Sequence, residues 1–337
     1  MTVHVRAYAA VGPKQPLQPT EYELGPLHPN DVQIQVSHCG LCRSDLDQID
    51  NRSGTVPYPL VAGHEIIGMV SAVGSAITHL QAGQRVGVGP ICSTCLSCQY
   101  CADGRDNLCR KMEFTIGGGR RGGFASVVQV PAPYAFPIPD SLAPENAAPL
   151  LCAGVTSYAP LRQHTSANSH VGVIGIGGLG HLALKFAAAR GSEVTAISSS
   201  ASKNDAARRF GAHHFVVSSD PEQMRKAAGS LDFILSTVDV DLNWLDYLSL
   251  LRPDGKICIV GASLGPINVP AGLLILGQYA FVGSAAGGRA VSAEMLEFSS
   301  RHRIWAETET MPIAEINNAI ELMRSGKAPF RLVLAHE

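Results

Sequence analysis

The stretch H-V-G-V-I-G-I-G-G-L-G occupies residues 170–180 and combines an apolar run with a glycine-rich turn. The apolar run at residues 170–175 predicts a buried strand, and L-A-L-K-F-A-A-A-R at residues 182–190 predicts a helix directly after the turn. Outward from here, strands and helices are predicted to alternate as far as residue 283. Further strands are expected at residues 193–198, 215–217, 233–236, 257–260 and 280–282, and a further helix at residues 203–210. This alternation is typical of a doubly wound parallel sheet, the Rossmann arrangement.

The glycines of the turn have the spacing of a dinucleotide-binding motif. Gly175, Gly177 and Gly180 form G-x-G-x-x-G between the predicted strand and the predicted helix. Such glycines permit a tight turn and let a pyrophosphate approach the amino terminus of the helix. A plain strand–turn–helix junction is the alternative, but here the motif has both of its flanking elements. We therefore expect a dinucleotide to bind the turn, including Gly178 and Leu179.

The end of the next predicted strand bears on which nicotinamide cofactor binds. Proteins that bind NAD usually carry Asp or Glu there, which holds the ribose hydroxyls. This chain has Ser198, Ser199 and Ser200 instead, followed by Lys203. No carboxylate repels a 2′-phosphate, and hydroxyls and a cation are available to bind one. We predict NADP(H); the alternative is a solvated turn with a surface lysine.

The first third of the chain is rich in Val, Gly and Pro, with short apolar runs between turn residues. Strands expected at residues 32–37, 66–73, 85–88 and 125–130 favour an all-β, barrel-like domain. A partly helical segment should follow, with Ser141 as a possible cap and Pro144 in its first turn. The tail has a predicted helix at residues 316–324 and an apolar run at residues 330–335, which could return to the first domain.

Nine cysteines in 337 residues do not resemble a disulfide scaffold, because five of them fall within one short segment at metal-ligand spacing. Cys95, Cys98, Cys101 and Cys109 form C-x2-C-x2-C-x7-C, which can surround one tetrahedral ion and close it to substrate. We expect a structural zinc site. A ligand set that uses Cys92 in place of one of these is the alternative, and a redox C-x-x-C pair is less favoured.

Composition excludes several classes of protein. The net charge of −2 provides no basic surface for nucleic acid. No apolar run approaches the roughly 18 residues of a membrane span, and the amino terminus lacks the apolar core of a secretory signal. Together with the clustered thiols, this favours a soluble enzyme in a reducing, cytoplasmic compartment, with no nucleic-acid or membrane partner.

Two further motifs provide the components of a second metal site. Cys42 is followed by Arg43, Ser44 and Asp45, and His64 with Glu65 opens G-H-E-I-I-G. A thiolate and an imidazole next to a hydroxyl suit a metal that leaves one position for a substrate oxygen.

These motifs, the four-cysteine loop and the G-I-G-G-L-G-H turn occur in one order. In that order the chain resembles the zinc-dependent medium-chain alcohol dehydrogenases, most closely the NADP-dependent cinnamyl alcohol dehydrogenase and aldehyde reductase branch. S-S-S-A-S-K and V-V-S-S-D-P-E match this branch, and the resemblance covers essentially the whole length. It implies a two-domain α/β protein, with a GroES-like β-rich catalytic domain at residues 1–155 and 285–337 around a Rossmann domain at residues 156–284.

The resemblance also implies the ligands of the second metal site. The catalytic zinc should be bound by Cys42, His64 and Cys152, the last from the C-A-G-V-T segment. Cys39 is not expected to bind, and Cys152 taken by itself would more often be a core thiol, as we expect of Cys258. With the four-cysteine site, the resemblance implies two zinc ions per chain.

Catalytic roles follow from the same resemblance. Ser44 resembles the hydroxyl that passes the alcohol proton outward, and Asp45 resembles the carboxylate that orients the ligating histidine. Glu65 should lie behind the zinc, where it could assist ligand exchange. Many relatives continue the proton relay with a histidine where this chain has Asp47, so whether Asp47 takes part is open. Each residue also has a simpler interpretation, such as helix capping for Ser44 and Asp45.

The resemblance further assigns cofactor contacts. Arg43 and Arg331 match positions that contact the pyrophosphate, and Thr156 lies in the segment that carries Cys152. Residues 110–121 look shortened relative to the branch, which makes the shape of the substrate site uncertain.

The resulting prediction is an NADP(H)-dependent enzyme that interconverts primary alcohols and aldehydes, mainly as an aldehyde reductase. Zinc would polarise the carbonyl, NADPH would supply hydride, and Ser44 would supply the proton. The alternatives are an NAD-preferring secondary-alcohol or polyol dehydrogenase, and a non-catalytic NADPH-binding sensor. Relatives are commonly dimers joined through the edges of their cofactor-domain sheets, so a homodimer through residues 279–284 is expected.

Overall fold

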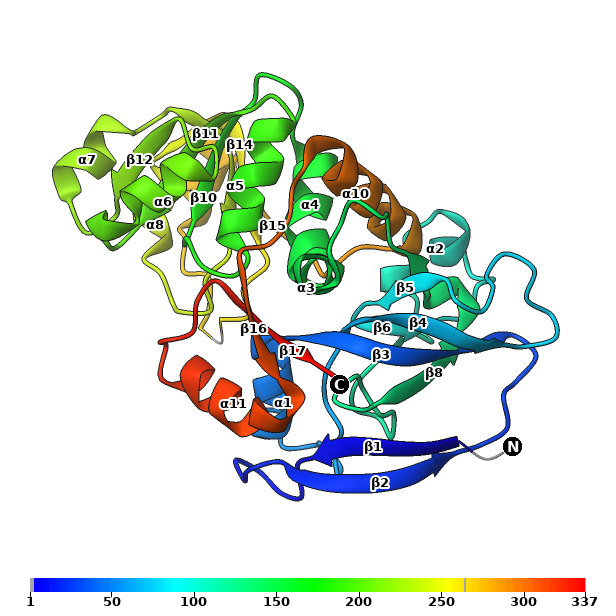
Figure 1. Ribbon diagram of the computed structural model, residues 1–337. Coiled ribbons are helices and arrows are strands. Elements are labelled where there is room, and N and C mark those ends of the chain that lie inside the picture. Colours follow the sequence, from blue (N-terminus) through cyan, green and yellow to red (C-terminus); the bar gives the residue numbers. More distant parts are fainter. Residues whose placement is uncertain (1–2, 264, 337) are drawn as a thin grey trace. The chain divides into compact units, whose positions relative to one another are not determined.

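The chain forms two units, the first from Met1–Cys152 with Gly287–Glu337 and the second from Ala153–Ala286 (Figure 1). The computed structural model describes residues 3–263 and 265–336. The carboxyl-terminal segment therefore belongs to the first unit, as its predicted helix and apolar run suggested. In the described part of the chain, no helix combines the length and apolar character needed to cross a membrane.

The first unit is built on a seven-stranded sheet of order β16-β17-β3-β4-β5-β9, in which β8 also pairs with β3. Two smaller two-stranded sheets, β1-β2 and β6-β7, complete it. The strands are β1 (Val3–Ala9), β2 (Gln18–Leu24), β3 (Asp31–Leu41), β4 (Glu65–Val73), β5 (Arg85–Val88), β6 (Ile91–Ser93), β7 (Glu113–Phe114), β8 (Val127–Pro131), β9 (Phe136–Pro137), β16 (Thr308–Pro312) and β17 (Arg331–Ala335). The β-rich domain expected from the sequence is confirmed.

The central pair of that sheet, β3 and β4, brings distant segments together. They run antiparallel, and β17 pairs antiparallel with the other edge of β3. A Cβ on Gly68 would lie 2.2 Å from the Gln35 carbonyl oxygen, so only glycine permits this close approach. Because β17 lies beside β3, the tail contributes residues to the same end of the sheet as the beginning of β4.

Short helices follow the strands of the first unit. They are α1 (Arg43–Ile49), α2 (Gln99–Ala102), η1 (Asp106–Leu108), η2 (Ala132–Tyr134), α3 (Pro144–Ala147), η3 (Ala148–Leu151), α10 (Arg289–His302), η5 (Ile313–Glu315) and α11 (Ile316–Arg324). The expected cap at Ser141 is wrong. Ala143 is the N-cap of α3, while the Ser141 hydroxyl oxygen lies 2.7 Å from that of Ser300. Proline at the start of α3 already fixes the helical φ, so no side-chain cap is required.

The second unit has one six-stranded parallel sheet of order β12-β11-β10-β13-β14-β15. Its strands are β10 (His170–Ile174), β11 (Glu193–Ser198), β12 (His214–Val217), β13 (Leu231–Ser236), β14 (Leu251–Ile259) and β15 (Ala280–Gly283). Its helices are α4 (Ala153–His164), α5 (Gly180–Ala189), η4 (Ala201–Lys203), α6 (Asn204–Arg209), α7 (Pro221–Lys226), α8 (Trp244–Leu248) and α9 (Ala271–Gly277). The predicted doubly wound parallel sheet is confirmed, with β10 in its interior.

One strand of this sheet begins earlier than the sequence predicted. We expected a strand at residues 257–260, whereas β14 begins at Leu251 and passes through a polar R-P-D-G segment. Leu251 pairs with Leu231, and the register shifts before the next pair. Because these residues are typical of a turn, hydrophobic periodicity does not indicate where the strand begins.

Candidate functional site

Cys42, His64 and Cys152 come together at one end of the first unit's main sheet. Cys42 caps α1 directly after β3, His64 precedes β4, and Cys152 follows η3. The Cys152 thiol lies 4.0 Å from the Cys42 sulfur and 3.4 Å from Nε2 of His64. One ligand atom from each of these residues and from Glu65 all lie within 4.8 Å of one another. We call Cys42, His64 and Cys152 the Cys–His cluster.

Asp45 determines how His64 presents its ring. Its Oδ1 lies 2.9 Å from Nδ1 of His64 and accepts the Gly63 amide at 2.8 Å, while Oδ2 accepts the Cys42 amide at 2.9 Å. Asp45 and His64 are almost fully buried. Because a carboxylate oxygen accepts hydrogen bonds, Nδ1 of His64 donates to Asp45, and Nε2 is the ring nitrogen directed at the thiols. This is the geometry of a braced metal ligand.

The ionisable groups of the Cys–His cluster affect one another strongly. The contact with the Cys152 thiol lowers the pKa of the Cys42 thiol well below its ordinary value, against the effect of burial. The same contact raises the pKa of Cys152. Burial alone would lower the pKa of His64, but Asp45 and Cys42 raise it well above its usual range. Buried negative charge of this kind favours a bound cation.

Glu65 and Arg331 form a buried ion pair beside the cluster. Nη2 of Arg331 donates to Oε1 of Glu65, and the pair joins β4 to β17. Burial raises the pKa of Glu65, and the Arg331 guanidinium is the main opposing influence. Oε2 of Glu65 is buried without a hydrogen-bond partner among the described residues. The side chain of Arg331 is only 5% exposed, and its pyrophosphate contact stays a prediction.

The first turns of α1 carry the other residues expected to take part in the chemistry. Ser44 and Arg43 are exposed, one residue apart at the start of the helix. Asp47 faces two cations: its carboxylate oxygens lie 3.3 Å from Nε of Arg43 and 3.4 Å from Nη1 of Arg52. Sequence reasoning missed Arg52, because no motif includes it. The predicted relay role of Asp47 remains open, now with two guanidinium groups beside its carboxylate.

The Cys–His cluster suits a zinc ion. Two thiols and one imidazole are the nitrogen and sulfur ligands that zinc prefers, and three protein ligands leave a fourth position. A carboxylate oxygen of Glu65 also lies within 4.8 Å of the same atoms. Cys39, which was not expected to bind, lies outside the group: its buried thiol faces the Gly40 carbonyl at 3.6 Å.

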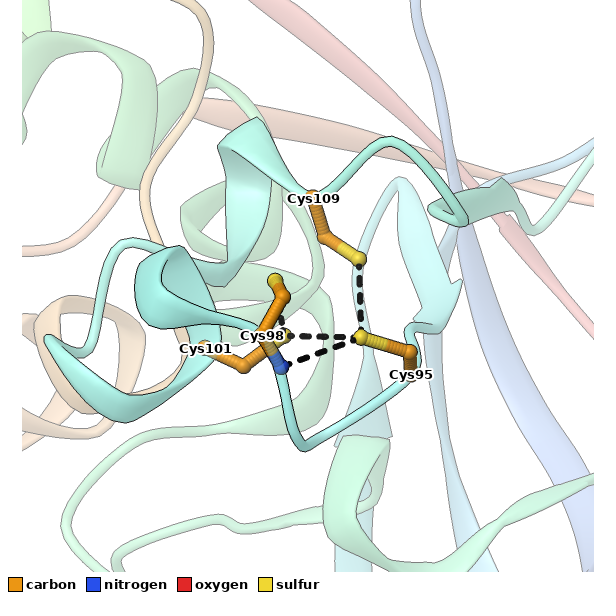
Figure 2. Close-up of side chains that lie close together, drawn as sticks. All are labelled: Cys95, Cys98, Cys101 and Cys109. Carbon is orange, nitrogen blue, oxygen red and sulfur yellow. Dashed lines mark hydrogen bonds between the residues drawn. The ribbon is translucent and has the colours of Figure 1, made fainter.

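A second group unites the thiols of Cys95, Cys98, Cys101 and Cys109 (Figure 2). The Cys95 sulfur lies 3.5 Å from that of Cys109 and 3.9 Å from that of Cys101, and the Cys98 and Cys101 sulfurs lie 3.5 Å apart. We call this the four-cysteine cluster. The thiol of Cys92 is directed elsewhere, to the Glu113 carbonyl at 3.6 Å.

Backbone amides favour thiolate in the four-cysteine cluster. The amides of Ser97 and Cys98 lower the pKa of Cys95 to about 6. The Cys98 amide nitrogen lies 3.3 Å from the Cys95 sulfur, and the Lys111 amide nitrogen lies 3.4 Å from the Cys109 sulfur. Amides therefore contact two of the four thiols, those of Cys95 and Cys109. Four thiols are the ligand set of a closed, structural zinc site.

The glycine-rich turn of the second unit lies between β10 and α5. Gly175 has φ of +88°, and a Cβ on Gly180 would lie 1.8 Å from the Gly175 carbonyl oxygen, so both positions require glycine. A Cβ on Gly177 would meet no atom within 4 Å. The turn therefore has no room for a side chain at Gly180, whereas the space beside Gly177 is open, as a bound pyrophosphate requires.

Five more of the residues expected to bind the cofactor belong to the second unit. Ser198 ends β11, and Ser199, Ser200 and Lys203 are exposed directly after it. Within this segment the Ser200 amide donates to the Ser198 hydroxyl at 3.2 Å. Thr156 is half-buried on α4. Cys258 lies in the core of the sheet, as expected.

Parts of both units match known protein families. Residues 28–140 match the alcohol dehydrogenase GroES-like domain and residues 178–301 match the zinc-binding dehydrogenase family. The chain is 41% identical to aldehyde reductase AdhA of Synechocystis sp. over 98% of this chain and 99% of that protein. A cinnamyl alcohol dehydrogenase from Sorghum bicolor (SbCAD4) superposes with a TM-score of 0.94 at 38% identity, covering 99% of this chain and 98% of that one. A second structure, of CAD from Helicobacter pylori complexed with NADP(H), superposes with a TM-score of 0.91 at 30% identity. The match covers 99% of this chain and 99% of that one.

Proposed function

The chain belongs to the zinc-dependent medium-chain alcohol dehydrogenases, and from that membership we propose that it interconverts primary alcohols and aldehydes with NADP(H), mainly as an aldehyde reductase. The observation that carries the proposal is the Cys–His cluster. His64 is held by Asp45 with its Nε2 directed at two thiols, and the three ligand atoms are those of a catalytic zinc site.

Cys42, His64 and Cys152 would hold the catalytic zinc, and Asp45 would keep the His64 ring in its binding orientation. A zinc ion bound there would act as a Lewis acid on the substrate oxygen, and NADPH would supply the hydride. Ser44 would donate the proton to that oxygen from the first turn of α1. We keep Asp47 only as a secondary candidate for the relay, because Arg43 and Arg52 already face its carboxylate.

Glu65 would stand behind the cluster as a charge that can respond to ligand exchange. Its Oε1 accepts a hydrogen bond from Arg331, and its buried Oε2 is without a partner among the described residues. One of its carboxylate oxygens lies within 4.8 Å of the other ligand atoms. Arg331 opposes the effect of burial on the pKa of Glu65 and so favours the ionised carboxylate, because removing the guanidinium would leave an uncompensated buried charge.

The four-cysteine cluster would hold a second, structural zinc ion, giving two per chain. The turn from Gly175 to Gly180 would bind the pyrophosphate of the cofactor, and the 2′-phosphate would meet the segment from Ser198 to Lys203. The NADP(H) complex of the Helicobacter pylori relative supports this cofactor. We place the enzyme in the cytoplasm.

We further propose a homodimer joined along β15. This strand forms an edge of the six-stranded sheet, where its free side can pair with a second copy. Nearby in sequence, α9 leaves Ile275 and Leu276 exposed by 74% and 84%. An apolar helix and an unpaired edge on one segment are features of a protein interface. Sedimentation analysis of the wild type and of Leu276→Asp tests this: the substitution should yield monomers.

An activity screen tests the proposed function. Aliphatic and aromatic aldehydes should be reduced with NADPH at a much lower Michaelis constant for the cofactor than with NADH. The reverse order would refute the cofactor, and binding of NADPH without turnover on any aldehyde would favour a non-catalytic sensor.

A further inference from the structure

Three side chains, of which His181 and Ser157 are buried and Thr237 is half-buried, make hydrogen bonds to carbonyl groups of the glycine-rich turn. Thr237 follows β13, and its hydroxyl lies 2.8 Å from the Ile174 carbonyl oxygen and 3.2 Å from that of Gly175. The same hydroxyl would lie 3.1 Å from a Cβ on Gly175 and 3.2 Å from a Cβ on Gly180. Thr237 therefore packs directly against both ends of the turn.

His181 and Ser157 make hydrogen bonds to carbonyl groups in the middle of the turn. Nδ1 of His181 lies 2.9 Å from the Gly177 carbonyl oxygen. Because a carbonyl oxygen only accepts, Nδ1 must carry the proton. The Ser157 hydroxyl, on α4, donates to the Leu179 carbonyl oxygen at 3.1 Å. The side chains of His181 and Ser157 are fully buried, so their hydrogen bonds do not compete with water.

Fixing these carbonyl groups also fixes the amides that follow them. In a trans peptide the C=O of one residue and the N–H of the next point in opposite directions. With the Gly177 and Leu179 carbonyls held inward, the amides of Gly178 and Gly180 point outward. The amides of Gly177 and Gly178 donate to no backbone carbonyl in the described part of the chain. They remain available to an anion at the open face of Gly177.

We propose that Thr237, His181 and Ser157 are positioning residues for the cofactor pyrophosphate: Thr237 holds the two ends of the turn, and His181 and Ser157 hold the amides of Gly178 and Gly180 in the orientation that binds the anion. The proposal rests on the cofactor binding described under the proposed function, but it concerns the pyrophosphate, which NADPH and NADH share. These side chains do not need to touch the cofactor. They reduce the ordering that the turn must undergo when the anion binds.

Thr237 offers the sharpest test, because valine has the same shape without the hydroxyl and serine keeps the hydroxyl. Dissociation constants of NADPH, NADH and adenosine 2′-monophosphate are measured by calorimetry on the full chain. Thr237→Val should weaken both dinucleotides by about fivefold, the loss of roughly one hydrogen bond. Adenosine 2′-monophosphate lacks the pyrophosphate, so its dissociation constant should stay within about twofold, and Thr237→Ser should keep all three ligands near wild type.

The outcomes separate this proposal from the cofactor assignment. If Thr237→Val binds both dinucleotides as Thr237→Ser does, or loses adenosine 2′-monophosphate equally, the positioning role is wrong. If the wild type prefers NADH, the NADP(H) assignment is wrong, and the ratio of Thr237→Val to Thr237→Ser for NADH still decides the positioning role.

His181 provides an independent pair in case Thr237→Val does not fold. Asparagine can place a nitrogen donor near the position of Nδ1, whereas leucine cannot donate. His181→Leu should therefore bind NADPH several-fold more weakly than His181→Asn. Equal affinity of the two variants would contradict the role of the His181 hydrogen bond.

Discussion

The two thiol clusters of the first unit differ in how far apart their residues lie along the chain. Cys95 to Cys109 fall within a single loop, and four sulfurs complete that group. The Cys–His cluster takes its atoms from the end of β3, the start of β4 and the end of η3, with 110 positions between Cys42 and Cys152. The first cluster can form locally, whereas the second exists only when the main sheet is folded.

Their surroundings differ as well. In the four-cysteine cluster, backbone amides donate to the thiols of Cys95 and Cys109. Around the Cys–His cluster stand the buried charges Asp45, Glu65 and Arg331. A closed set of thiolates held by amides suits a structural ion, while an incomplete set among buried charges suits an ion that must exchange a ligand during turnover.

Loss of a ligand from the Cys–His cluster should have the largest effect. His64→Ala should lower kcat/KM for aldehydes by roughly 1000-fold, because the ligand set that stabilises charge on the substrate oxygen is broken. Steady-state kinetics and metal analysis measure this, with one zinc ion lost per chain. His214→Ala, at an exposed position in the second unit, is the matched control. Full turnover and unchanged metal content in His64→Ala would refute the assigned site.

Loss of a ligand from the four-cysteine cluster should act on stability instead. Cys109→Ser should remove one zinc ion and lower the free energy of unfolding by several kcal/mol, since structural metal binding contributes directly to folding. Turnover of the folded fraction at low temperature should remain near wild type. Cys92→Ala is the control, because its thiol faces the Glu113 carbonyl. If Cys92→Ala also lost a zinc ion, the alternative ligand set would be correct.

Removing the hydroxyl of Ser44 should have an intermediate effect on turnover. Ser44→Ala should lower kcat by roughly 100-fold, in the range of general acid–base catalysis, while NADPH affinity stays within about twofold. Asp47→Asn is the comparison. Since Arg43 and Arg52 already face Asp47, we expect a much smaller effect on kcat. An equal loss in both variants would place Asp47 in the proton relay.

The smallest predicted effect is on the pH dependence of folding stability, through His336 at the end of the sheet that carries the Cys–His cluster. Beyond β17, Nε2 of His336 donates to the Gly123 carbonyl at 3.1 Å, and burial lowers the pKa of His336 to about 4. The folded chain therefore favours the neutral imidazole, and the unfolded chain binds the proton more tightly. Stability is full above the unfolded pKa of about 6.5 and is lost as the pH falls toward about 4, by up to about 2 kcal/mol at pH 5.

Denaturant unfolding at pH 7 and pH 5 measures this dependence. His336→Gln keeps a donor for the Gly123 carbonyl but does not titrate, so its stability should change less between the two pH values. If the variant and the wild type lose stability equally, His336 is not the group responsible.

The contrast between the two clusters also explains what the sequence could predict. Cysteine spacing alone identified the four-cysteine cluster, because its geometry is local. The glycine-rich turn could also be predicted from the sequence, because its strand, turn and helix are adjacent along the chain. Cys152 required the family resemblance, because no local spacing links it to Cys42. The Glu65–Arg331 pair depends on β17 lying beside β3, a pairing of distant segments that periodicity does not encode.

Smaller failures have the same origin. The polar segment in β14 interrupts the apolar pattern and hid the beginning of that strand. Ser141 looked like a helix cap but pairs with Ser300, from a segment more than 150 residues away. The role of the residue after the glycine motif, His181, depends on a hydrogen bond to a carbonyl that only the folded turn displays.

Zinc content per chain tests the division between the two clusters most directly. It is measured by elemental analysis on the wild type, Cys42→Ala and Cys109→Ser, with aldehyde reduction assayed on the same samples. We predict two zinc ions in the wild type and one in each variant, with turnover lost only in Cys42→Ala. A wild type with a single zinc ion, or a Cys42→Ala variant that keeps two zinc ions and full turnover, would contradict the assignment.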